Sequence, residues 1–380
     1  MRTEGIDIGW AAGTVRSCDR ARRRSAGLAA VAAALAAVAG CSADRPGPEP
    51  PISVSPPQSM VSVGAAVPEV LATGLDAPWS IAFHEGTPLV SERDSARVLE
   101  LDAGGNARGI GTIDGAAGRG EGGLLGIAVQ DGYLYTYLTA GVENRIERRA
   151  ITGEPGSLEL GEAETILDGI PAGPVHNGGR IAFGPDGLLY ATTGDAGNRD
   201  SAQDLESLSG KILRMTPDGA EPPDNPFPGT LVYSYGHRNP QGIAWDSNGT
   251  LYASEFGQNT WDELNVIEAG GNYGWPEVEG IAGEEGFTDP VQQWTPGAAS
   301  PSGIAVAGNS LLIANLRGER LVEVPLSDLG TSTEYLMGEY GRLRDVVNAP
   351  DGSAWILTNN TDGRGQPTPE DDRILRMDVD

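Results

Sequence analysis

The sequence predicts an all-β protein, specifically a six-bladed β-propeller of antiparallel four-stranded blades. Three observations support this prediction: one strand motif recurs six times, a hairpin turn follows most copies, and helical periodicity is almost absent. The six copies of the motif occupy residues 78–83, 123–129, 179–183, 241–245, 302–306 and 344–347. A β-sandwich or a β-solenoid would contain similar hairpins, but six repeats match a known propeller size.

Short turns separate the recurring strand from a second β-rich run in several repeats. They include Pro185-Asp186-Gly187, Ser247-Asn248-Gly249 and Pro350-Asp351-Gly352, and Asp-Gly or Asn-Gly between such runs is a strong hairpin signal. Third strands are predicted at residues 97–101, 211–215, 320–324 and 373–377. The first strand of each propeller blade surrounds a central channel, so we expect the loops that enter the six recurring strands to converge at one mouth.

The N-terminal segment resembles a bacterial lipoprotein export signal. Four arginines between residues 20 and 24 precede an apolar run at residues 26–39, which is too short to cross a bilayer comfortably, and small residues lead to Cys41. We expect residues 1–40 to be removed and Cys41 to carry lipid, anchoring the exported protein to the outer face of the cytoplasmic membrane or to the cell surface. The alternative is ordinary secretion with cleavage nearby, which would leave the protein periplasmic or secreted.

The composition indicates where the propeller begins and which classes of binding partner are excluded. Residues 41–67 are rich in Pro, Ser and Gly and are predicted to form a flexible tether, so the propeller would span residues 68–380. Cys18 precedes the predicted cleavage, so the mature protein would have no internal disulfide and no cysteine-based zinc site. The formal net charge of -27 would repel nucleic acid, and we expect membrane contact only through the lipid.

Polar residues gather in the loops that enter the recurring strands, where a functional site is expected. These residues are Glu121, His176, Arg238, Asn239, Gln241, Ser302, Arg342 and Arg344. His176 is suited to general-base catalysis, because imidazole titrates near neutrality and can accept a proton from an alcohol. A histidine beside glycines is more often a structural hydrogen-bonding residue, and only its predicted place at the mouth favours catalysis.

The arginines at the mouth indicate an anionic ligand. Arg238, Arg342 and Arg344 would bring three positive charges together, and guanidinium groups bind carboxylates in a bidentate manner. The alternative is that each arginine pairs with a neighbouring acid such as Asp345. Residues 254–265 are dense in oxygen donors, which suits either a calcium ion or a network of capped turns.

Several motifs in a fixed order resemble the pyrroloquinoline quinone (PQQ)-dependent soluble glucose and aldose dehydrogenases, also called the glucose/sorbosone dehydrogenase family. The resemblance extends from about Leu71 to the C-terminus. It rests on residues 120–126 (GEGGLLG), 176–195, 210–214 (GKILR), 236–242 (GHRNPQG), 262–265 (DELN), 271–276 (GNYGWP) and 341–345 (GRLRD). It implies a six-bladed propeller that oxidises an aldose sugar at C1 to the lactone, with PQQ and calcium as cofactors.

The resemblance also implies a role for particular residues. His176 would accept the proton of the sugar C1 hydroxyl while hydride passes to PQQ, and Arg238 together with calcium would polarise the quinone carbonyl that receives it. Asn239 would contact PQQ, as would Arg342 and Arg344 through its carboxylates. PQQ and the backbone carbonyls of Gly257 and Gln258 would hold the calcium ion. The electron acceptor, whether a quinone, a cytochrome or another redox carrier, is not identified by the sequence.

Four positions depart from the family pattern. Glu121 stands where glucose-oxidising members have glutamine, and Arg317 stands where they have a lysine against PQQ; we include both among the cofactor-binding residues. Gln258 replaces a proline, which is tolerable if only its carbonyl is used. Val175 replaces a sugar-contacting aspartate, which favours the broader aldose-oxidising branch.

Two other functions are compatible with a propeller of this sequence. The first is a calcium-dependent propeller lactonase without a redox cofactor, although a neutral lactone would not explain converging arginines. The second is a non-catalytic propeller that binds carbohydrate or protein, because a fold by itself does not determine a function.

Overall fold

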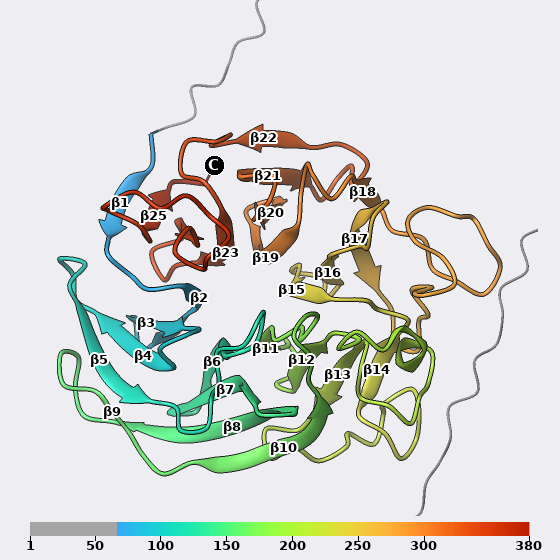
Figure 1. The fold of residues 1–380 in the computed structure, drawn as a ribbon, viewed down its shortest axis with the longest axis horizontal. Coiled ribbons are helices and arrows are strands. Elements are labelled where there is room, and N and C mark those ends of the chain that lie inside the picture. Colours follow the sequence, from blue (N-terminus) through green and yellow to red (C-terminus); the bar gives the residue numbers. More distant parts are fainter. Residues whose placement is uncertain (1–66, 380) are drawn as a thin grey trace, which may run out of the picture. The chain divides into compact units, whose positions relative to one another are not determined.

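The computed structural model describes residues 67–379, which form six antiparallel sheets arranged in a ring (Figure 1). The predicted six-bladed propeller is therefore confirmed, and each recurring strand is the innermost strand of one blade. The predicted export signal, the lipid site at Cys41 and nearly all of the tether lie outside the described residues. Within the described part of the chain, no helix is both long and apolar enough to span a membrane.

The strands follow the chain from the centre of each blade outward. Blade 1 contains β2 (Pro78–His84), β3 (Thr87–Glu92), β4 (Arg97–Leu101) and β5 (Ala107–Thr112). Blade 2 contains β6 (Leu124–Gln130), β7 (Tyr133–Ala140), β8 (Glu143–Thr152) and β10 (Glu164–Pro171), with the short β9 (Glu159–Leu160) paired to β8. Blade 3 contains β11 (Ile181–Phe183), β12 (Leu189–Thr193), β13 (Lys211–Met215) and β14 (Val232–Tyr235), and a 3-10 helix, η1 (Arg199–Ala202), follows β12.

The remaining blades have the same order, except that the last one borrows a strand. Blade 4 contains β15 (Pro240–Trp245), β16 (Leu251–Glu255), β17 (Asp262–Ile267) and β18 (Gln292–Trp294). Blade 5 contains β19 (Pro301–Ala307), β20 (Ser310–Asn315), β21 (Arg320–Pro325) and β22 (Thr333–Tyr335). Blade 6 contains β23 (Leu343–Asn348), β24 (Ala354–Thr358) and β25 (Ile374–Met377), and its outer strand is β1 (Glu69–Ala72) from the beginning of the propeller.

The recurring glycine of the strand motif allows neighbouring innermost strands to approach closely. A Cβ atom added at Gly126 would lie 2.3 Å from the carbonyl oxygen of Gly179, and one added at Gly242 would lie 2.2 Å from that of Ser302. Real side chains cannot accommodate such distances without moving the backbone. Glycine is therefore required at these positions by the packing of one blade against the next. The equivalent positions of three other innermost strands are occupied by Ser80, Arg180 and Asp345.

The innermost strands are also irregular where they begin, at the mouth. Five of the six have a register shift against the second strand of their blade near this end. A β-bulge bends a strand and changes the direction of its side chains. Below the mouth, a cavity of about 510 Å³ is lined by residues of all six innermost strands.

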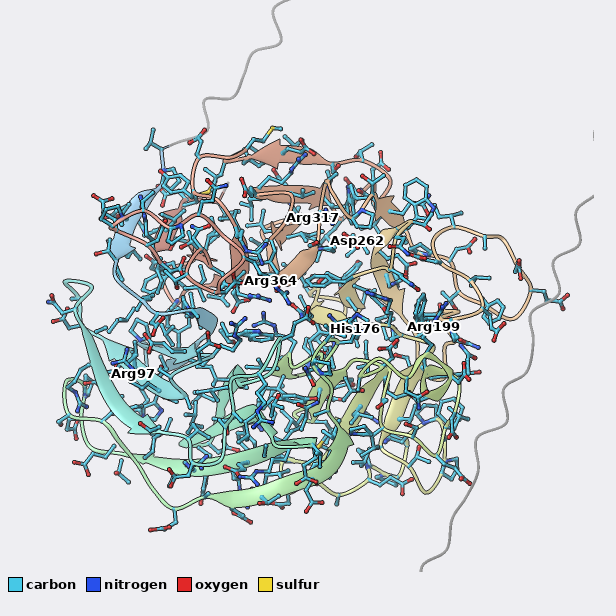
Figure 2. The ribbon with its side chains drawn as sticks, in the orientation of Figure 1. Arg97, His176, Arg199, Asp262, Arg317 and Arg364 are labelled. Carbon is cyan, nitrogen blue, oxygen red and sulfur yellow. The ribbon has the colours of Figure 1, made fainter. Side chains whose placement is uncertain are left out.

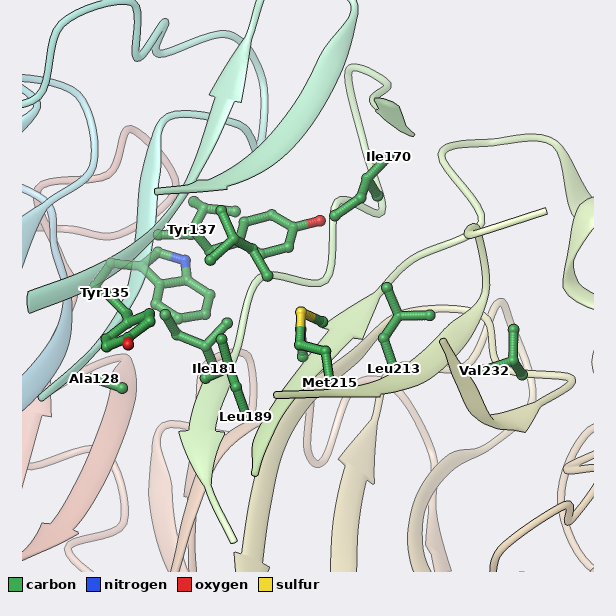
Figure 3. Packing of buried hydrophobic residues seen from close by; sticks show 13 residues of the cluster. Ala128, Tyr135, Tyr137, Ile170, Ile181, Leu189, Leu213, Met215 and Val232 are labelled. Atoms are coloured by element: carbon green, nitrogen blue, oxygen red, sulfur yellow. The ribbon is translucent and has the colours of Figure 1, made fainter. Parts of the chain in front are cut away.

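Apolar side chains fill the space between adjacent blades. Figure 3 shows one such cluster, in which Tyr137 and Ile181 pack with Leu213 and Met215 between blades 2 and 3. The Tyr137 hydroxyl donates a hydrogen bond of 2.9 Å to the carbonyl oxygen of Asn177. This contact attaches the core to the loop that contains His176.

Lys211, the only lysine, is fully buried at the start of β13 and organises the loop between β12 and β13. Its Nζ donates to the carbonyl oxygens of Ser201 (2.7 Å), Ala202 (3.0 Å) and Ser209 (2.6 Å). Burial lowers the pKa of Lys211 to about 7. One side chain therefore satisfies three carbonyl groups of a loop that has no regular strand pairing.

We expect Lys211→Met to lower the free energy of unfolding by about 3 kcal/mol, because it leaves buried carbonyl oxygens without a donor. The comparison is the urea midpoint of the variant with that of the wild type. Arg376→Gln, at a side chain whose ion pairs are exposed, is the matched control and should change the free energy by less than about 1 kcal/mol. Equal midpoints for Lys211→Met and the wild type would contradict this role.

Candidate active site

The predicted site residues meet at one face of the propeller, here called the mouth face. All innermost strands begin at this face, and the second strands run antiparallel and end there. The mouth face therefore receives two loops from each repeat, namely the one before the innermost strand and the one after the second strand. Figure 2 shows His176, Arg317 and Arg364 around the centre of the ring.

His176 is held by two carboxylates. Its backbone N–H donates to Glu121 Oε2 at 2.8 Å, and its Nδ1 lies 2.7 Å from Asp195 Oδ1. The Nε2 atom has no hydrogen-bond partner among the described residues, and the side chain is 18 % exposed. The pairing with Asp195 favours the tautomer with the proton on Nδ1, which leaves Nε2 as a proton acceptor at the mouth.

Asp195 is buried and accepts several hydrogen bonds. Oδ2 accepts from Nε1 of Trp275 at 2.9 Å, and Oδ1 also accepts from the backbone N–H of Gly197 at 2.7 Å. Burial by itself raises the pKa of Asp195, but the hydrogen bonds from His176, Gly197 and Trp275 outweigh it and the pKa lies below its usual range. Asp195 is therefore a carboxylate that both orients His176 and stabilises a positive charge on it.

The backbone around His176 explains the glycines of its motif. His176 has a φ of +58°, a left-handed conformation that is unfavourable for a residue with a side chain. A Cβ atom added at Gly194 would lie 2.0 Å from the His176 carbonyl oxygen. Glycine at this position lets the His176 loop lie directly against the loop that supplies Asp195.

A buried glutamate fixes the loop that contains Arg238 and Asn239. Glu255, at the end of β16, accepts hydrogen bonds from the backbone N–H groups of both residues, and its other oxygen lies 2.8 Å from Nδ1 of buried His237. The Arg238 guanidinium donates to the carbonyl oxygen of Gly257 at 2.6 Å. Arg238 Nε and Asn239 Nδ2 are buried and have no partner among the described residues, so two donors at the mouth can bind a ligand.

The loop with Gly257 and Gln258 presents backbone carbonyls above several acidic side chains. Glu279 accepts the N–H of Gln258 at 2.7 Å, and Asp262 accepts that of Gly257 at 2.8 Å. Burial raises the pKa of Asp262 to about 6, and burial together with repulsion from Glu255 raises that of Glu263. These carboxyl groups lie against the loop, and their raised pKa values mean that a nearby cation would stabilise their charged forms.

The protein alone offers a calcium ion few ligands. Among residues 67–379, no group of three or more Asp, Glu, His or Cys side chains is arranged to hold a metal. Calcium takes six to eight oxygen ligands, so two backbone carbonyls would need several more from a cofactor and water. The backbone at Gly257 accommodates only glycine, because a Cβ atom there would lie 1.7 Å from the Trp261 carbonyl oxygen.

Arg342 and Arg344 form a cluster with one shared carboxylate. Arg342 lies 3.1 Å and Arg344 lies 3.8 Å from Asp362 Oδ2, and Arg93 lies 4.0 Å from the same atom. Burial, together with repulsion from neighbouring guanidinium groups and against the opposing effect of Asp362, lowers the pKa of Arg344 to about 9. Because Arg93 also pairs with Asp94 at 2.6 Å, Asp362 is left to balance both Arg342 and Arg344, and this excess positive charge fits a ligand with carboxylate groups.

Other predicted partners are arranged differently from the expectation. Asp345 pairs with Arg180 at 2.9 Å, so it does not neutralise Arg344. Glu121 Oε1 accepts a 3.0 Å hydrogen bond from Arg364. The positive charge of Arg364 therefore lies next to the glutamate that stands where glucose-oxidising members of the family have glutamine. Arg317 is exposed and has no carboxylate partner within 4.0 Å among the described residues.

Five residues of this site were missed by the sequence prediction: Asp195, Glu255, Trp275, Asp362 and Arg364. Three of them, Asp195, Asp362 and Arg364, follow second strands, which a propeller also directs to the mouth face. That topological rule could have selected these three, because the hairpins had been recognised. Trp275 lies in the long segment between β17 and β18, where no repeat predicts its position.

A cavity slightly larger than the one below the mouth lies elsewhere. It has a volume of about 570 Å³ and lies between the β4–β5 hairpin and Trp355. None of the predicted site residues lines it, so the chemistry of the mouth is a better guide to the site than cavity volume.

The chain is similar in sequence or in structure to several named sugar dehydrogenases. A PQQ-bound aldose sugar dehydrogenase from Streptomyces coelicolor is 51% identical, with a TM-score of 0.80 over 83% of this chain and 98% of that one. The aldose sugar dehydrogenase YliI of Escherichia coli is 29% identical over 340 residues, covering 78% of this chain and 90% of the relative. Quinoprotein glucose dehydrogenase B of Acinetobacter calcoaceticus is 30% identical over 258 residues, covering 58% of this chain but only 54% of the relative.

The family model of glucose and sorbosone dehydrogenases matches residues 75–375, which is almost the whole propeller. This agrees with the resemblance found in the ordered sequence motifs. The chain belongs to the glucose/sorbosone dehydrogenase family.

Proposed function

We propose that this protein oxidises an aldose at C1 to the lactone, with PQQ as the redox cofactor and calcium as a bound ion. The observation that carries the proposal is the His176–Asp195 pair, whose free Nε2 lies at a mouth lined by arginines and unsatisfied buried donors. The PQQ-bound relative from Streptomyces coelicolor supports the choice of cofactor.

The residues at the mouth fit PQQ, which carries carboxylates and quinone oxygens. Arg342 and Arg344 would bind carboxylates, because their shared Asp362 cannot neutralise both. Asn239 Nδ2 and Arg238 Nε would donate to oxygens of the cofactor, and exposed Arg317 would contribute charge. Glu121 remains a proposed cofactor contact, with Arg364 offsetting its negative charge.

The chemistry that PQQ supplies when bound is an electrophilic quinone carbon that accepts hydride. His176 Nε2 would accept the proton of the C1 hydroxyl as the hydrogen on C1 leaves with its electron pair, which converts the C1–O bond to the lactone carbonyl. Asp195 holds the Nδ1 proton and stabilises the imidazolium that forms. The Arg238 guanidinium would stabilise the negative charge that develops on the reduced cofactor.

Calcium would use the carbonyl oxygens of Gly257 and Gln258, with its other ligands supplied by the cofactor and water. The negative charge beneath this loop supports the assignment. Gly257 also accepts a hydrogen bond from Arg238, so the ion and the guanidinium would share this carbonyl. A lactonase or a binding propeller would leave the arginine cluster and the unsatisfied donors without a purpose. Anchoring through Cys41 remains a prediction from the sequence.

We expect His176→Ala to keep PQQ binding but to lower aldose-dependent reduction of PQQ by about 100- to 10,000-fold, because the general base is removed. Rapid mixing of the PQQ-loaded variant with an aldose, followed by quinone absorbance, measures this rate. Equal PQQ affinity in the two proteins is the control. Reduction at the wild-type rate would remove His176 from the mechanism.

We expect Asp195→Asn to lower kcat by roughly 100-fold, because an amide cannot stabilise the imidazolium as a carboxylate does. The lowered pKa of Asp195 means that its carboxylate stabilises the fold at neutral pH and that this contribution is lost as the pH falls through the folded pKa. The variant should therefore lose part of the acid sensitivity of unfolding. An unchanged kcat across the pH profile would argue against a role in positioning His176.

We expect Arg342→Gln combined with Arg344→Gln to weaken PQQ binding at least about 100-fold, because two charged hydrogen-bond donors are lost. Equilibrium dialysis of the apo protein gives the affinity. Arg376→Gln, on β25, the third strand of blade 6, serves as the control with the same change of residue type. Unchanged affinity in the double variant would place the anionic groups of the cofactor elsewhere.

A further inference from the structure

Most arginines in the described part of the chain are neutralised by a carboxylate. Residues 67–379 contain eighteen arginines, and fourteen of them have a carboxylate oxygen of a described residue within 4.0 Å. This is expected from the composition, because 53 acidic residues accompany only 26 basic ones. The exceptions within residues 67–379 are Arg119, Arg199, Arg238 and Arg317.

All four exceptions lie on the mouth face. Arg119 and Arg238 precede the innermost strands β6 and β15, whereas Arg199 and Arg317 follow the second strands β12 and β20. The proposed cofactor site uses Arg238 and Arg317 but neither Arg119 nor Arg199. The mouth therefore has more positive charge than the cofactor contacts account for, in a protein that is otherwise strongly acidic.

Arg199 is connected to His176 by three consecutive contacts. Its guanidinium carbon lies 4.4 Å from the centre of the Trp275 ring, Trp275 donates a 2.9 Å hydrogen bond to Asp195, and Asp195 holds His176 at 2.7 Å. Figure 2 shows Arg199 and His176 as neighbours in this view of the mouth face. The ring holds the guanidinium in place by a cation–π contact and leaves its N–H groups unused.

The Arg199 side chain is exposed and donates no hydrogen bond to a described residue. Its guanidinium can therefore bind an incoming carboxylate or phosphate in a bidentate manner without first breaking an internal contact. The strongly negative net charge of the protein would otherwise repel such a group. Arg199 therefore offers a positive charge, unpaired among residues 67–379, next to the Trp275–Asp195–His176 series of contacts.

We propose that Arg199 determines substrate specificity by binding an anionic group of the sugar, so that the preferred substrate is an aldose with a carboxylate or phosphate remote from C1. This inference rests on the proposed aldose oxidation, because it places C1 at His176. The oxidation at C1 is the same as for a neutral sugar. A hexuronic acid and a hexose 6-phosphate both have an anionic group on the opposite side of one pyranose ring from C1, and both can be tested.

The first experiment compares D-glucuronic acid, D-glucose 6-phosphate and D-glucose as substrates of the PQQ-loaded protein at low and high salt. We expect kcat/KM for at least one anionic sugar to exceed that for glucose by about tenfold or more, mainly through KM. The preference should decrease as salt screens the charge. Whichever of the two anionic sugars has the larger kcat/KM shows whether the site prefers a carboxylate or a phosphate.

Arg199→Gln should lower this preference at least about tenfold, Arg199→Lys should keep part of it, and Arg376→Gln should leave it unchanged. Binding provides a readout that does not depend on turnover: calorimetry with the PQQ-loaded His176→Ala protein should show the same order of affinities, and adding Arg199→Gln should remove it. Oxidation of glucose without preference for either anion, or a preference that survives Arg199→Gln, would overturn the inference and leave the proposed function intact. Failure to oxidise all three sugars would instead contradict the proposed function.

Discussion

The pairing of β1 with β25 closes the ring, and the whole site depends on this closure because its residues come from all six blades. Glu69 lies opposite Arg376 in this pairing, so the two ends of the propeller meet within one sheet. Hydrogen bonds close to the mouth cross the same seam: the Ala77 N–H donates to Thr361 at 2.7 Å and Asn359 donates to the Pro78 carbonyl at 2.9 Å. The Arg93–Asp362 contact also joins blades 1 and 6, so Arg93 reaches the cluster of Arg342, Arg344 and Asp362 only when the ring is closed.

Closure brings together charges that a folded protein normally keeps apart or pairs fully. Asp195 is stabilised by three donors, whereas Arg238 and Asn239 retain buried donors without partners and the pKa of Arg344 is lowered. Buried donors without partners reduce stability. The carboxylate and the incompletely satisfied donors and cations differ in what they can do: Asp195 orients His176, whereas the others would be completed by the anionic cofactor that we propose. The mouth is thus the part of the fold where stability is given up for binding.

The sequence predicted the repeating part of the structure and the loops that meet at the mouth. The innermost strands were found because their short apolar motif recurs six times, and in three copies Gly126, Gly242 and Gly303 lie where a side chain would collide with the next strand. The loops with His176 and Arg238 were found from the same repeat. Asp195, Asp362 and Trp275 were not, because they belong to loops of different length that share no motif. The closing strand β1 was also missed, since four residues without a turn signal do not indicate a partner some three hundred positions away. The ion pair of Asp345 with Arg180 depends on which side chains meet across the channel, which neighbouring sequence cannot reveal.

We propose that PQQ binds at the mouth beside His176 and accepts the hydride that leaves C1 of the aldose. The most direct test is to titrate the purified apo protein with PQQ and calcium, and then to add an aldose without oxygen while recording the quinone absorption. We expect saturable binding of one PQQ per chain. The quinone absorption should then be lost only when the sugar is added. Absence of PQQ binding with calcium present, or bound PQQ that no aldose reduces, would contradict this proposal.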